Sequence, residues 1–174
     1  RIIEKWDHAI DLTEQLISEK QKFRKGLVQK LTTGRRKLTG YTNDWDTVRV
    51  KELLCVRNEK ATKSEQEPLY SLTIENGVTP KTERYNREQL VKDTSNKKYK
   101  RVYPNDLVFN PANLRWGAIA RCKTSNPVLV SPIYEVLYVK NPETTDIGFV
   151  TQALCSDREI ARFASQVEGT LVER

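Results

Sequence analysis

Basic and aromatic residues are concentrated between positions 79 and 101, and they are the strongest candidates for binding chemistry. This segment holds eight lysines and arginines against three acidic residues. Such a composition is typical of a surface that binds a polyanion such as nucleic acid. A solvated basic loop is the alternative interpretation. The residues that we expect to contact the polyanion are Lys81, Arg84, Tyr85, Arg87, Lys97, Lys98, Lys100 and Arg101.

Two polar clusters carry side chains that could read bases. One surrounds the Asn76-Gly77 turn signal, and the other follows an apolar stretch that predicts a strand. Arginine pairs with guanine and asparagine with adenine in the major groove. The alternatives are a turn cap for Asn110 and a core position for Trp116. The expected base-reading residues are Asn76, Thr79, Asn110, Asn113, Arg115 and Trp116.

Residues for catalysis are hard to find. The sequence has one histidine, His8, and contains neither a Gly-x-Gly loop nor an acid-x-Lys pair. Nucleophile–histidine catalysis, a dinucleotide-binding loop and a nuclease metal site therefore lack their motifs. We expect no enzyme activity, no catalytic or metal-binding residue and no cofactor.

The cysteine count and the hydropathy indicate the compartment. Three cysteines, an odd number, lie far apart, which argues against a disulfide framework and favours a reducing cytoplasm. No apolar run approaches the roughly 18 residues that span a bilayer. The expectation is a cytoplasmic protein with no membrane partner.

The N-terminal segment predicts one long helix. Apolar residues recur every three or four positions over 2–33 without a proline, and such a helix would be about 45 Å long. Gly34 is the expected C-cap, and a basic hinge follows to residue 40. The apolar residues form two seams, so one can pack on the rest of the chain while the other meets a partner helix. The seam that we assign to a partner contains Ile3, Trp6, Ile10, Ile17, Leu27 and Leu31.

The segments after residue 40 favour strands first and helices later. Strands are predicted over 48–53, 69–74, 102–110 with an internal turn, 117–121 and 128–139, with polar loops at 57–68 and 79–101. Helices are predicted over 146–154 and from the capping box at Ser156 to about residue 167. The expected class is α+β: a long coiled-coil-type helix, then a mixed, mostly antiparallel sheet with C-terminal helices. The predicted domains are 1–40 and 41–174.

Motifs along nearly the whole chain resemble the specificity subunits of type I restriction–modification enzymes. Each motif is weak alone, but their order and spacing are specific. The spacer-helix motifs are Trp6-Asp7-x-Ala9-Ile10, Lys20-x-x-x-Arg24-Lys25-Gly26-Leu27 and Lys30-Leu31-x-x-Gly34-Arg35-Arg36. Those of a target recognition domain are Ser71-x-x-x-Glu75-Asn76-Gly77-Val78-x-Pro80, Asp106-Leu107-Val108-Phe109-Asn110 and Ser131-Pro132-x-Tyr134-x-Val136.

The resemblance implies a function and partners. Family members carry two target recognition domains, each reading one half of a split duplex DNA site, separated by two conserved helices that dock the methylating subunits and, through them, the restriction subunits. Compared with that plan, this sequence begins within a spacer helix and ends before the second conserved helix. The first helix could therefore also form a homodimer. The alternative function is a coiled-coil scaffold that contacts only protein.

Overall fold

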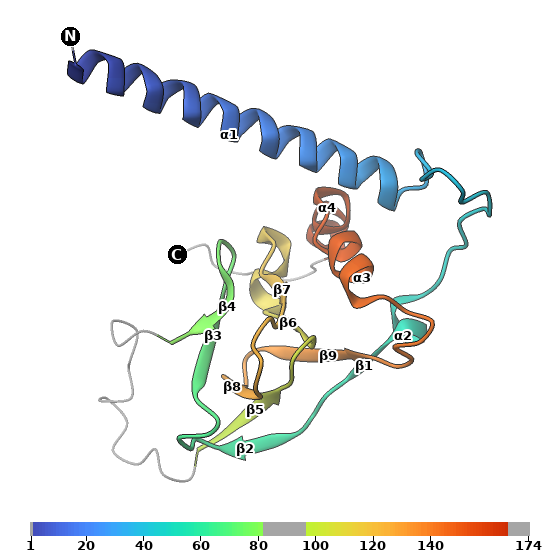
Figure 1. Ribbon diagram of the computed structural model, residues 1–174. Coiled ribbons are helices and arrows are strands. Elements are labelled where there is room, and N and C mark those ends of the chain that lie inside the picture. Colours follow the sequence, from blue (N-terminus) through green and yellow to red (C-terminus); the bar gives the residue numbers. More distant parts are fainter. Residues whose placement is uncertain (1, 82–96, 167–174) are drawn as a thin grey trace. The chain divides into compact units, whose positions relative to one another are not determined.

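The computed structural model describes residues 2–81 and 97–166, which form two compact units, residues 1–46 and 47–174 (Figure 1). A long helix, two mostly antiparallel sheets and C-terminal helices confirm the expected α+β class. The division between the units follows Asp46, whereas the sequence suggested a boundary at residue 40.

The first unit consists of a helix and the segment that follows it. Helix α1 spans Ile2–Thr32 and has no buried residue. It ends where Gly34 adopts a left-handed conformation with φ of 71°, which confirms the predicted C-cap. The indole of Trp45 packs against this cap so closely that a Cβ on Gly34 would lie 2.2 Å from Trp45 Cδ1. Glycine is therefore required here both by φ and by space.

The second unit is built on two sheets. The first has the order β1-β9-β6-β7 and the second the order β2-β5-β8-β3-β4. All pairs are antiparallel except β3 with β8. The strands are β1 (Leu54–Val56), β2 (Lys60–Thr62), β3 (Leu69–Thr73), β4 (Gly77–Pro80), β5 (Lys98–Val102), β6 (Leu107–Phe109), β7 (Ile119–Arg121), β8 (Val128–Val130) and β9 (Glu135–Val139).

The two sheets meet along their edges. Strand β4 of one sheet lies against β7 of the other, and a Cβ on Gly77 would lie 3.1 Å from Ala120 Cβ. A buried apolar core includes Val102, Val108 and Val136, drawn from both sheets, and Tyr134 packs against it. The contact between β4 and β7 thus brings the turn after β3 to the segment that precedes β7.

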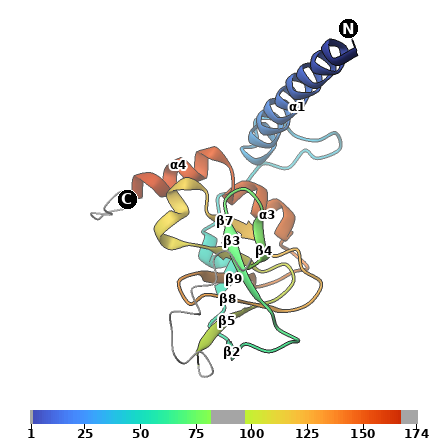
Figure 2. The same cartoon turned by 90° about the vertical axis from the view of Figure 1, so that its left-hand side faces the viewer.

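Short helices cover one end of this unit. They are α2 (Val50–Leu53), the 3₁₀ helix η3 (Pro111–Trp116), α3 (Ile147–Leu154) and α4 (Asp157–Gln166). Asp146 caps α3 by accepting a hydrogen bond from the Phe149 amide, and the Ser156 hydroxyl accepts one from the Glu159 amide at 3.4 Å. Both C-terminal helices were predicted, the second from the capping box at Ser156. Figures 1 and 2 show η3, α4 and the β3–β4 turn at one end of the sheets, and β2 at the other.

Three of the predicted local structures are wrong. Residues 48–53 were expected to be a strand, but Val50–Leu53 form one helical turn before β1 begins at Leu54, since the apolar spacing fits either structure. Residues 57–68 were expected to be a loop, but they contain β2. The expected loop at 79–101 likewise ends in a strand, β5, whose residue Tyr99 is buried. Both short strands depend on their pairing with each other, which local sequence does not encode.

Among the described helices, no stretch is apolar enough to cross a membrane.

Candidate nucleic-acid interface

The β3–β4 turn presents Asn76 to solvent. Gly77 follows it with φ of 69°, and the Asn76 amide donates to Thr73 Oγ1 at 3.1 Å, so the turn is held by its own hydrogen bonds. Thr79 pairs with Ser71 inside the hairpin and is half-buried. Asn76 is therefore free to extend from the tip, whereas Thr79 lies mainly within the ladder.

The 3₁₀ helix η3 positions the second polar cluster. Asn110 Oδ1 accepts a hydrogen bond from the Ala112 amide at 3.1 Å, so Asn110 serves as the helix cap, the alternative that the sequence left open. Asn113 is exposed. The Arg115 guanidinium stacks on the Trp116 ring, 4.0 Å from its centroid, and Trp116 is 51% exposed. Trp116 is thus a surface residue rather than a core residue.

The contact of β4 with β7 places the two clusters on one end of the unit. The chain leaves η3 through Gly117 and enters β7 at Ile119, next to the position where Gly77 approaches Ala120. Both views show the β3–β4 turn and η3 on this end (Figures 1 and 2). We call the exposed residues Asn76, Asn113 and Trp116, together with the half-buried Arg115, the turn–η3 surface.

Exposed lysines gather at the other end, where β5 begins. Lys97 and Lys98 are exposed, and the Lys97 ammonium lies 5.6 Å from the Tyr99 ring centroid. Lys60 on β2 is also exposed and pairs across the ladder with Lys100. Nothing in the local sequence marks Lys60, because only the β2–β5 register brings it opposite Lys100. Lys81 is half-buried after β4, and its amide donates to the Leu69 carbonyl at 3.0 Å.

Two residues of the expected polyanion-binding set, Lys100 and Arg101, and the neighbouring Tyr99 have other roles. Tyr99 is in the core with 4% exposure. Lys100 is buried and donates to Glu135 at 2.7 Å. Arg101 is ion-paired with both Glu59 and Glu67. The assignment of Lys100 and Arg101 to phosphate contacts is therefore corrected, because their charges are already neutralised within the chain.

These ion pairs shift pKa values in the directions expected of stable pairs. Hydrogen bonding from Arg101 lowers the pKa of Glu59. Hydrogen bonds to Glu67 and Glu59 raise the pKa of Arg101. Both groups thus stay charged at neutral pH.

A second network fixes the corner between β1 and β2. Arg57 donates from Nε and Nη2 to the carboxylate of Asp106 at 2.7 and 3.1 Å, and its guanidinium lies 4.6 and 4.5 Å from the ring centroids of Tyr103 and Tyr138. The Tyr103 hydroxyl donates to Glu59 at 3.1 Å. Burial opposes the charge of Arg57, but the Asp106 carboxylate outweighs it and raises the pKa of Arg57. Nothing in the local sequence marks this network, because Arg57 and Asp106 lie 49 positions apart.

Arg84, Tyr85 and Arg87, the remaining members of the expected basic set, lie outside the described residues.

The expected partner seam of α1 is accessible. Ile3, Trp6, Ile10 and Ile17 are exposed, and Leu27 and Leu31 are half-buried. Leu16 and Phe23, on the other seam, are exposed as well. Large apolar side chains in water at regular spacing favour contact with another helix.

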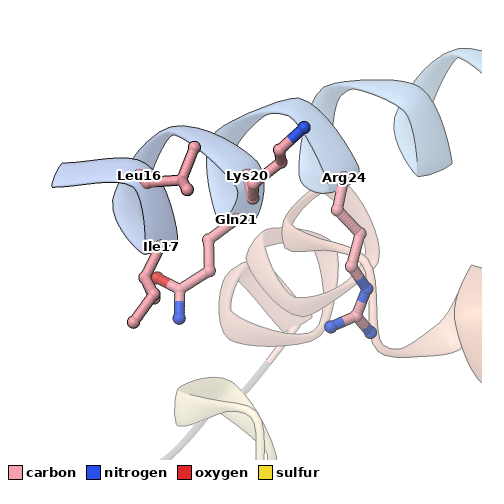
Figure 3. A pocket seen from close by; sticks show the side chains of 5 residues that line it. All are labelled: Leu16, Ile17, Lys20, Gln21 and Arg24. Carbon is pink, nitrogen blue, oxygen red and sulfur yellow. The ribbon is translucent and has the colours of Figure 1, made fainter. Parts of the chain in front are cut away.

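Charge divides α1 into two halves. Residues 2–19 carry five acidic side chains and one lysine, whereas residues 20–32 carry five basic side chains and no acidic one. A shallow hollow lies near the midpoint, lined by Leu16, Ile17, Lys20, Gln21 and Arg24. Figure 3 shows Ile17, Gln21 and Arg24 extending to the same side of the helix. A second helix that runs antiparallel would set each acidic half against a basic half.

Comparison with known proteins assigns no family. The chain matches no protein-family model and no curated protein sequence. Within residues 2–81 and 97–166, no group of three or more His, Cys, Asp or Glu side chains could hold a metal ion.

Proposed function

We propose that this chain binds duplex DNA sequence-specifically, as a target recognition domain with a spacer helix in a prokaryotic type I restriction–modification complex. The observation that carries the proposal is the turn–η3 surface. It gathers Asn76 and Asn113, both exposed and chemically suited to base edges, beside the Arg115–Trp116 pair. A net charge of +7 supports a polyanionic partner.

The exposed lysines and the turn–η3 surface have different roles in DNA recognition. Exposed lysines near the start of β5, Lys60, Lys97 and Lys98, are suited to phosphates, which set the position and register of the protein. The turn–η3 surface is suited to base edges, where asparagine amides read adenine. The ion-paired cations Lys100 and Arg101 stabilise the fold and contribute to DNA binding only indirectly.

Helix α1 serves assembly in this proposal. Its exposed apolar residues, including Trp6 and Ile10, offer a docking face for the methylating subunits and, through them, the restriction subunits. Catalysis belongs to those subunits, so the purified chain should neither methylate DNA with S-adenosylmethionine nor cut it with Mg²⁺. Methyl transfer by the chain alone would contradict this assignment.

The second candidate function, a coiled-coil scaffold without DNA specificity, is favoured by the same exposed face of α1. Selection from duplexes with randomised positions separates the two candidates. The DNA-binding module should enrich a short base sequence at physiological salt, whereas a scaffold should enrich none.

A double variant that leaves the net charge unchanged tests which residues determine the sequence preference. Asn76→Ala with Asn113→Ala should lose the enriched sequence but retain general binding, because phosphate contacts remain. Asn58→Ala, at another exposed asparagine of the same unit, is the control and should keep the preference. Unchanged selection by the double variant would remove the turn–η3 surface from the readout.

A further inference from the structure

Arg115 carries a charge that no carboxylate of residues 2–81 and 97–166 pairs with. Its guanidinium lies on the Trp116 ring, 4.0 Å from the centroid, near the end of η3. Two of its three guanidinium nitrogens, Nε and Nη2, are buried and have no hydrogen-bond partner. Among the described residues, no carboxylate forms an ion pair with this side chain.

Such an arrangement is costly in the free protein. Buried donors without acceptors lose their hydration and gain nothing in return. Stacking on the Trp116 ring offsets only part of this loss. An anion brought to the remaining nitrogen, Nη1, would compensate the charge in a setting that water screens poorly. The guanidinium of Arg115 is therefore prepared for a negatively charged partner.

We propose that Arg115 and Trp116 form a binding site for one phosphate group, which in the proposed function is a phosphate of the DNA backbone. A guanidinium makes paired contacts through the Nε–Nη2 edge or the Nη1–Nη2 edge, and both edges require Nη2. Because Nη2 is shielded, the paired contact to guanine O6 and N7 is closed to Arg115 in this conformation. The expectation that Arg115 reads a base is thereby replaced by a positioning role.

That the phosphate belongs to DNA rests on the proposed function. The first test of the site itself needs no DNA. Arg115→Met keeps an unbranched apolar side chain on the Trp116 ring and removes the uncompensated charge. The melting temperature of the 174-residue chain should rise by about 2–4 °C. Arg49→Met, which removes an exposed arginine of the same unit, should leave it nearly unchanged. An unchanged or lower melting temperature for Arg115→Met would show that the charge is already compensated and would overturn the proposal.

Inorganic phosphate then probes the site directly. Against sodium chloride at the same ionic strength, phosphate should raise the melting temperature of the unmodified chain and of Arg49→Met more than that of Arg115→Met. Phosphate also stabilises proteins by exclusion from their surface, so the difference between variants is the readout. Equal shifts in all three proteins would overturn the site.

Duplex DNA identifies the source of the phosphate. Arg115→Met should weaken binding to all sequences alike and reduce the slope of log K against log salt by about 0.9, the value for one lost phosphate contact. A loss confined to one base pair with an unchanged slope would overturn the proposal in favour of base reading. If the unmodified chain binds no DNA, the proposed function fails, and the response to inorganic phosphate decides the site by itself.

Discussion

Replacing Ile10 and Ile17 with glutamate tests whether α1 pairs with a second copy of itself. Both residues lie on the expected partner seam, and they are 54% and 51% exposed. Fully burying an isoleucine stabilises by about 1.5–3 kcal/mol, so covering the exposed half of each contributes about 1 kcal/mol. A symmetric pair covers four such side chains, and their loss should cost about 4 kcal/mol, which weakens association roughly 10³-fold.

Sedimentation velocity measures this directly. The unmodified chain should sediment as a dimer at tens of micromolar, and the Ile10→Glu, Ile17→Glu variant as a monomer. Leu16→Glu with Phe23→Glu is the matched control on the other seam. The sequence suggested that this seam packs on the rest of the chain, but both side chains are exposed, so the variant should remain folded and dimeric.

The direction of the pair follows from the charge of α1. In an antiparallel pair the acidic residues 2–19 face the basic residues 20–32, so salt should weaken association. A parallel pair would set like charges together, and salt should then strengthen it. A monomeric unmodified chain at tens of micromolar would refute the reasoning altogether. A dimer that only the control variant breaks would assign the pairing to the other seam.

Three further predictions concern the second unit. Lys97→Ala with Lys98→Ala should weaken binding to every duplex alike and flatten the salt slope by about 0.9 per lost contact; an unchanged slope would place the phosphate contacts elsewhere. Asp106→Asn, which leaves a partly buried guanidinium without its carboxylate, should lower the free energy of unfolding by about 3 kcal/mol in urea titrations; a loss below about 1 kcal/mol would show that the network is dispensable. Because Arg101 lowers the pKa of Glu59, this carboxylate stabilises the fold above its unfolded pKa, and the contribution is lost as pH falls through the lower folded value. Glu59→Gln should therefore reduce the acid sensitivity of melting below about pH 4.5, and a pH profile identical to that of the unmodified chain would contradict this.

Local signals in the sequence were enough to predict the helices and turns. The 3.6-residue periodicity of α1, the left-handed glycine at Gly34 and the caps Asp146 and Ser156 each act within a few residues of where they stand. The Asn76-Gly77 turn was equally readable, since few residues other than glycine adopt its positive φ easily. These features depend on backbone geometry and on hydrogen bonds between near neighbours, so the sequence alone determined them.

Only the tertiary structure decided which basic residues remain available for a ligand. Lys100 and Arg101 look like their neighbours Lys97 and Lys98 in the sequence. Their carboxylate partners lie 34 to 42 positions away and arrive through strand pairing. The same pairing makes a polar stretch into strand β2 and brings Lys60 opposite Lys100. Composition gives the number of charges, but whether a charge faces water or a carboxylate partner depends on the register of distant strands.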